Sequence, residues 1–226
     1  MSHTAPPAHD HKRTGPRGSV SFLRRPLDLV RANVRAYILL SVLAYGLVAI
    51  GMVVGILFPE LSAARAETLE TDGTGDLVRS LVSNPWLFAA LILAVNVGQL
   101  SLVTIVLPSV IVPFGGILAF SIWALITGVT IVPADEAGWV AMIPHSVTLV
   151  IELQAYVLVL LGAFLIGKRW LRPGSIGQAT HRGGYLRGLQ ELGWLAIPAF
   201  VLLVIGAIWE SLSLVYLVYP LQQWLL

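Results

Sequence analysis

Two carboxylates and three other polar side chains interrupt the apolar stretches of this 226-residue chain. They are Glu152, Glu210, Asn96, Gln99 and His145. A carboxylate in lipid costs roughly 2.5–3.5 kcal/mol on insertion scales, so such residues are rare there and mark candidate functional sites. Carboxylates and imidazoles bind cations and carry protons, whereas carboxamides offer hydrogen bonds.

The depths of three of these residues agree with one another. Glu152, Glu210 and Asn96 lie eight, nine and eleven residues from the expected outer ends of their segments. At the rise of an α-helix these spacings correspond to about 12, 14 and 16 Å. We therefore expect one polar cluster in the outer half of a bilayer, contributed by three helices.

Spacing also relates the remaining polar residues. His145 and Glu152 are seven residues apart on one helix face, with about 10 Å of rise between them, too far for direct contact. Asn96 and Gln99 share a face at a spacing of three.

Three interpretations of the cluster remain open. The polar groups could hydrogen-bond across helices and fix the packing, with Glu152 or Glu210 protonated. They could instead form an ion, proton or metal site, or receive the transmembrane helix of a partner. The identity of any metal stays unknown, because the sequence has no His-Glu-x-x-His motif. No nucleophile elbow, P-loop or dinucleotide fingerprint is present, so we expect a non-enzymatic protein without a cofactor.

The composition indicates the environment of these residues. Apolar residues make up 57% of the chain and charged residues 12%, compared with roughly 45–50% and about 25% in soluble domains. This excludes a soluble globular enzyme, a disordered chain and a nucleic-acid-binding domain. Cysteine is absent, which excludes disulfides and thiolate metal sites. The composition predicts an all-α, polytopic membrane helical bundle.

Five segments are apolar and long enough to cross a bilayer as helices. The expected spans are 37–58, 85–107, 113–132, 144–167 and 194–219. Residues 80–134 carry no charge, and Pro108 and Pro113 predict a turn between the second and third spans; a re-entrant pair of half-helices is the alternative.

The residues before the first span divide into two parts. Residues 1–18 are rich in His, Pro and Gly and are expected to be a disordered cytoplasmic tail. In residues 19–36 apolar side chains alternate with arginines, which predicts an amphipathic helix on the membrane surface. Residues 37–226 then form the transmembrane domain.

The basic residues predict the orientation. Seven lie before the first span and five in the loop 168–193, whereas the other loops hold two in all. The positive-inside rule then predicts a cytoplasmic N-terminus and an outer C-terminus. Of the 14 basic and 12 acidic residues, only Glu152 and Glu210 lie within the expected spans.

Small residues mark one helix-packing site. Gly51 and Gly55 form a Gly-x-x-x-Gly pattern in the first span, which permits close approach of another helix. Both packing within the bundle and formation of a homo-oligomer are consistent with this pattern.

An ordered series of motifs follows Asn96 along the second half of the chain. The series is Pro113-Phe114-Gly115-Gly116, Pro144-His145, Glu152-Leu153-x-Ala155, Gly162 and Gly167, Leu171-Arg172-Pro173-Gly174, Arg182 and Arg187, and Ala207-x-x-Glu210. In this series the chain resembles the stage II sporulation protein M family of prokaryotic membrane proteins. Ser146 stands where that family usually has Gly, and Glu152 follows His145 by seven residues rather than four.

The resemblance implies a multi-span protein without known catalytic activity in the cytoplasmic membrane of a prokaryote. The family's namesake acts as a membrane scaffold in a complex that remodels the cell wall. We therefore expect a scaffold or complex subunit whose partners are the lipid bilayer and other membrane or cell-envelope proteins. A channel or permease-type subunit using Glu152 and Glu210 is the alternative.

Overall fold

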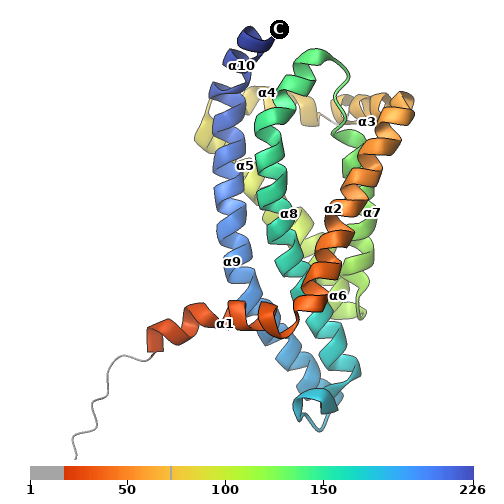
Figure 1. Cartoon of the computed structure of the whole chain (residues 1–226), viewed down its shortest axis with the longest axis vertical. Helices are drawn as coiled ribbons and strands as arrows, with labels where there is room; N and C mark the ends of the chain where they lie inside the picture. Colours follow the sequence, from red (N-terminus) through yellow and green to blue (C-terminus); the bar gives the residue numbers. More distant parts are fainter. Residues whose placement is uncertain (1–17, 72) are drawn as a thin grey trace, which may run out of the picture.

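The computed structural model describes residues 18–71 and 73–226, which fold into helices joined by short connections (Figure 1). No strand occurs within these residues, in agreement with the predicted all-α class. Most of the predicted tail, residues 1–17, lies outside the described part of the chain.

The helices follow one another with few intervening residues. In chain order they are α1 (Gly18–Ala32), α2 (Val34–Leu57), α3 (Pro59–Thr71), α4 (Thr74–Leu81), α5 (Pro85–Ala94), the π-helix η1 (Val95–Val106), α6 (Leu107–Ile111), α7 (Gly115–Thr130), α8 (Glu136–Leu171), the 3-10 helix η2 (Pro173–Ile176), α9 (His181–Tyr216) and α10 (Val218–Leu225).

Four helical segments are long and apolar enough to cross a membrane: α2, the continuous segment Pro85–Ile111, α8 and α9. The third predicted span also forms a helix, α7, but it has only 16 residues. That length corresponds to about 24 Å, which is less than the roughly 30 Å of a bilayer core. The described structure thus supports a multi-pass membrane protein with four clear candidate spans.

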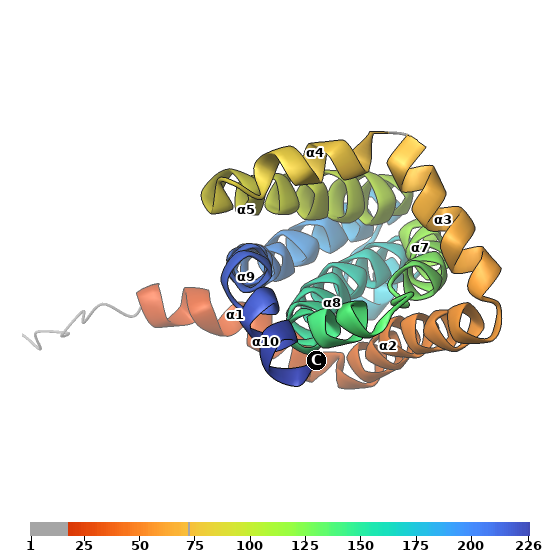
Figure 2. The same cartoon turned by 90° about the horizontal axis from the view of Figure 1, so that it is seen from above.

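Helix α8 lies at the centre of the bundle. Seen from above, α2 and α7 flank it on one side and α9 on another, with α5 beyond α9 (Figure 2). Residues 157–167 of α8 are apolar on every face, and Leu160, Leu161 and Leu165 are fully buried. A helix that is apolar on every face is favoured in the interior of a bundle.

The two ends of the bundle differ. Helix α1 lies across the bundle axis at one end, here called the α1 end, while α3 and α4 lie across the other, the α3 end (Figures 1 and 2). Large apolar side chains on the outer faces of α2 and α7 are exposed, among them Leu39, Val42, Leu118 and Ile122. Such faces are suited to contact with lipid.

Helices α8 and α9 extend beyond the predicted spans. Asp135 caps α8, because its Oδ1 accepts a hydrogen bond from Gly138 N at 2.7 Å, and Thr180 caps α9 through Gly183 N at 3.1 Å. Much of the predicted loop 168–193 is therefore helical, since polar caps start helices before their apolar stretches begin.

The turn between the second and third predicted spans lies at residues 112–114. Phe114 adopts a left-handed conformation with φ of 65°, and Ser109 Oγ accepts a hydrogen bond from Gly116 N at 3.0 Å. Helix α6 approaches α9, where Tyr185 Oη donates to Val110 O at 3.1 Å. Because Tyr185 is near the start of α9, the turn lies toward the α1 end, and α7 returns from there to the α3 end (Figure 1).

Candidate functional site

His145 and Glu210 form a pair between α8 and α9. Their Nδ1 and Oε1 atoms are 3.5 Å apart, and both side chains are partly exposed. They line a partly open cavity of about 470 Å³, formed by residues of α7, α8, α9 and their connections near the α3 end. The pair is therefore the accessible part of the predicted cluster.

Glu152 and Asn96 form a second, deeper pair. Asn96 Nδ2 donates a hydrogen bond to Glu152 Oε1, which joins η1 to α8. The Glu152 side chain also contacts α9, where a Cβ on Gly206 would lie 3.2 Å from Glu152 Cγ. Two helices thus converge on this carboxylate, and no hydrogen bond joins it to Glu210 within the described residues.

The segment that carries Asn96 is a π-helix rather than the expected α-helix. Ser101 Oγ donates to Asn96 O, and Thr104 Oγ1 donates to Gln99 O, both at 2.9 Å and five residues apart. A π-helix bonds residue i to i+5 and changes which side chains share a face. Asn96 accordingly faces α8, while Gln99 is exposed on the outside of the bundle.

Gln99 therefore does not join the cluster. Its exposed neighbours on the same segment are apolar, among them Val95, Leu102 and Val103. Within the described residues its carboxamide has no hydrogen-bond partner. Asn96 therefore uses its carboxamide in a hydrogen bond inside the bundle, whereas the carboxamide of Gln99 faces outward among apolar side chains.

A polar stripe on α8 runs inward from the cavity. His145, Thr148, Glu152 and Tyr156 follow at spacings of three and four, which places them on one helix face. Thr148 and Tyr156 are each only 1% exposed. The Thr148 hydroxyl has no hydrogen-bond partner in the part of the chain that the structure describes, whereas the Tyr156 hydroxyl lies close to the Glu152 carboxylate. The Tyr156 ring packs on Phe120 of α7.

A second polar network, on another face of α8, did not emerge from the sequence analysis. Tyr37 Oη donates to Gln154 Oε1 at 2.6 Å, Gln154 Nε2 donates to Tyr45 Oη at 2.9 Å, and Tyr45 Oη donates to Val150 O at 3.2 Å. These bonds join α2 to α8. The available signal was Gln154 itself, a carboxamide two residues after Glu152 in the same span.

An ionic site at the α1 end was also missed. The nearly buried carboxylate of Glu191 contacts Arg169 of α8 and Arg187 of α9. The sequence places Glu191 in a basic segment just before an apolar stretch, where an acidic residue normally indicates a solvated loop. Its burial follows from the early start of α9, which brings Glu191 against α8.

Gly51 and Gly55 lie against α7. A Cβ on Gly51 would be 2.3 Å from Leu125 O and 2.8 Å from Gly128 Cα, and one on Gly55 would be 2.8 Å from Val129 O. Close approach of this kind requires glycine. The Gly-x-x-x-Gly pattern is thus used within one chain.

The arrangement limits the chemistry of the site. Among the described residues no group of three His, Asp or Glu side chains is placed to hold a metal ion, because the cluster is divided into a His–Glu pair and an Asn–Glu pair. These pairs can fasten helices together, and the cavity gives water or a small cation access to one of them.

Comparison of the chain with protein-family models, curated proteins and solved structures finds no match, so the family is not identified by similarity.

Proposed function

We propose that this chain is a non-enzymatic integral membrane protein that acts as a scaffold or a subunit of a membrane complex. The observation that carries the proposal is the placement of Gln99. It lies near the middle of the membrane-length segment Pro85–Ile111, faces outward and has no partner for its carboxamide within the described residues. Polar groups on lipid-facing helix surfaces are costly and act as hydrogen-bonding contacts between transmembrane helices.

The inner polar groups support the same proposal. Asn96 with Glu152, and His145 with Glu210, use their polar atoms between helices of the same bundle. Between these pairs and the α1 end, α8 contributes fully buried apolar side chains, such as Leu160 and Leu161, to the core of the bundle. A bundle that exposes the carboxamide of Gln99 near the middle of a membrane-length segment suits a protein that binds another membrane helix.

A photo-crosslinking amino acid at position 103, an exposed position beside Gln99 on η1, tests the proposal in cells and leaves the carboxamide in place. We expect a discrete crosslinked product from position 103 and none from position 118 on α7, where Leu118 is 67% exposed. Gln99→Leu should abolish co-purification of the crosslinked partner without changing the yield of folded protein. Retention of the partner by Gln99→Leu would contradict the proposal. A product of twice the chain mass would identify a homo-oligomer.

The proposed topology has five spans, a cytoplasmic N-terminus, an outer C-terminus and α1 on the inner surface of a prokaryotic cytoplasmic membrane. The basic residues of α1, the end of α8 and the start of α9 support this orientation, because they belong to elements at the α1 end. The resemblance to the stage II sporulation protein M family is part of the same proposal.

Single cysteines provide a direct test of topology, since the chain has none of its own. Ser175→Cys reports on the α8–α9 connection and Ser83→Cys on the α4–α5 connection, and both positions are exposed. A membrane-impermeant maleimide added to intact cells should label position 83 and spare position 175. The reverse pattern would invert the proposed orientation, and labelling of both would remove the proposed α7 span.

Transport of a cation or proton is the second candidate function. The cavity at His145 and Glu210, together with the Thr148 hydroxyl that has no partner within the described residues, favours it. Proton and cation flux into liposomes should be measured for the parent, Glu152→Gln and Glu210→Gln, with Glu60→Gln on exposed α3 as the control. Loss of flux in Glu152→Gln and Glu210→Gln but not in Glu60→Gln, with unchanged folded yield, would support transport. Absence of flux in the parent would favour the scaffold.

A further inference from the structure

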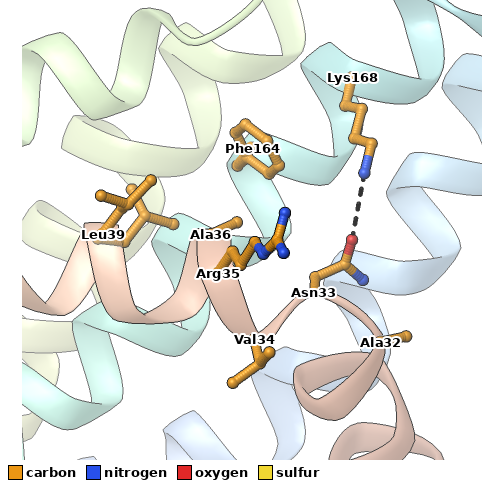
Figure 3. A pocket seen from close by; sticks show the side chains of 9 residues that line it. Ala32, Asn33, Val34, Arg35, Ala36, Leu39, Phe164 and Lys168 are labelled. Atoms are coloured by element: carbon orange, nitrogen blue, oxygen red, sulfur yellow. Dashed lines mark hydrogen bonds between the residues drawn. The ribbon is translucent and has the colours of Figure 1, made fainter.

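A pocket with two basic side chains lies where α1, α2 and α8 meet (Figure 3). Its volume is about 510 Å³. The Arg35 side chain from α2 and the Lys168 side chain from α8 point into it, while Val34, Leu39 and Phe164 provide apolar walls. The pocket therefore joins a cationic region to an apolar one.

Asn33 fixes the geometry of the cationic region. It is the single residue between α1 and α2, is 9% exposed, and donates from Nδ2 to Leu29 O at 3.0 Å. Its Oδ1 accepts a hydrogen bond from Lys168 Nζ at 3.4 Å. The carboxamide thus holds the bend between the helices and positions the ammonium group beside Arg35.

The positive charges in this pocket are not neutralised by the protein. Neither Arg35 nor Lys168 forms an ion pair with an acidic side chain in the described residues, whereas the nearby Arg169 and Arg187 both contact Glu191. The Lys168 ammonium also lies over the Phe164 ring, 5.8 Å from its centroid. An arginine and a lysine that converge without a carboxylate favour an anionic ligand with several oxygens.

The apolar walls of the pocket favour a phospholipid headgroup over a free phosphate ion as the source of that anion. Val34 is 47% exposed and Leu39 is 69% exposed, and both belong to the membrane-length helix α2. A phosphate bound at Arg35 and Lys168 would place attached acyl chains along this exposed apolar face. A free phosphate ion would make no use of the apolar walls.

We propose that the pocket binds the phosphate headgroup of an anionic phospholipid. Arg35 and Lys168 contact the phosphate, Asn33 positions Lys168, and the first turns of α2 with Phe164 contact the upper part of the acyl chains. This site is at the opposite end of the bundle from His145 and Glu210 and does not depend on the scaffold or transport proposals.

Native mass spectrometry on the full chain, purified from mixed micelles containing phosphatidylglycerol and phosphatidylcholine, tests the site. We expect the parent to retain phosphatidylglycerol in preference to phosphatidylcholine. The double variant Arg35→Gln/Lys168→Gln should lose this preference by at least about fivefold, because each basic residue contributes a factor of roughly that size at a membrane surface. The matched control is Arg172→Gln/Arg182→Gln, which removes the same charge from exposed positions at the same end.

Three results would overturn the proposal. They are equal retention of both lipids by the parent, an equal loss of preference in both double variants, and displacement of phosphatidylglycerol by inorganic phosphate at equimolar concentration. The last would assign the pocket to a free anion. If the double variant does not fold, the single variants Lys168→Gln and Lys168→Arg replace it. Lys168→Gln should weaken the preference for phosphatidylglycerol, whereas Lys168→Arg should keep it. Equal behaviour of the two variants would contradict a role for the charge.

Discussion

Arg169 Nε lies 3.1 Å from Glu191 Oε2 across the interface of α8 and α9, and both side chains are nearly buried, with exposures of 12% and 5%. Arg187 Nε approaches the other carboxylate oxygen at 3.3 Å from a side chain that is 51% exposed. Glu191 is therefore shared between one buried and one solvated arginine. This arrangement joins α8 to α9 at the α1 end, where His181 Nδ1 of α9 also lies 2.6 Å from Trp170 O of α8.

Replacement of Glu191 should destabilise the protein strongly. Glu191→Gln leaves the buried Arg169 guanidinium without a carboxylate, and loss of one partner of a buried ion pair costs about 3 kcal/mol. Arg187→Gln removes only the exposed contact and should cost less than about 1 kcal/mol. Thermal unfolding in detergent compares the two variants. Similar losses of stability in both would show that Arg169 is not the dominant partner.

The hydrogen bond between Asn96 and Glu152 permits a double-mutant cycle. Asn96→Leu and Glu152→Leu each leave one polar partner unpaired, whereas the double variant removes both polar groups together. Interhelical hydrogen bonds in a membrane average about 0.6 kcal/mol and reach about 1.7 kcal/mol, so we expect a coupling energy within this range. Unfolding of the four proteins in the same detergent measures it.

An additive cycle would contradict the proposed pairing. The Ser83→Ala variant, at an exposed position outside the long helices, combined with Glu152→Leu provides the control and should give no coupling. The expected result would also place Glu152 among residues that act in packing. A folded Glu152→Leu protein with normal stability would instead point to a role outside packing.

The positions of the long helices could be predicted because apolar length is a local property of the sequence. Each expected span contains a helix. The caps at Asp135 and Thr180 start α8 and α9 before their apolar parts, and α9 ends at Tyr216, three residues before the expected end of the fifth span. The similar depths of Asn96 and Glu152 were predictable for the same reason, and the hydrogen bond between them is consistent with those depths. The length of a span and the depth of a residue within it both follow from the rise per residue of a helix, so a single sequence is enough to predict them.

Rotation about the helix axis could not be predicted in the same way. The expectation that Asn96 and Gln99 share a face assumes an α-helix, but i+5 bonding in η1 separates them. The bonds of Gln154 to Tyr37 and Tyr45, and of Glu191 to Arg169, join residues between 22 and 117 positions apart in the chain. Such contacts depend on which helix faces meet, and a single sequence carries little information about that.

Two glycines of α2 give the sharpest test of helix packing. Gly51→Ala places a Cβ 2.3 Å from the backbone oxygen of Leu125, a distance that the contact with α7 cannot accommodate without movement of the helix. Overpacking of this kind costs about 1–3 kcal/mol.

Gly46→Ala adds the same methyl group to the same helix at a position with no atom within 4 Å. It should be neutral or stabilising by up to about 1 kcal/mol, since alanine favours helices. Thermal unfolding in detergent should therefore separate the two variants clearly. Equal stability would mean that α2 and α7 do not pack through Gly51, and the short helix α7 would then lack its closest neighbour in the bundle.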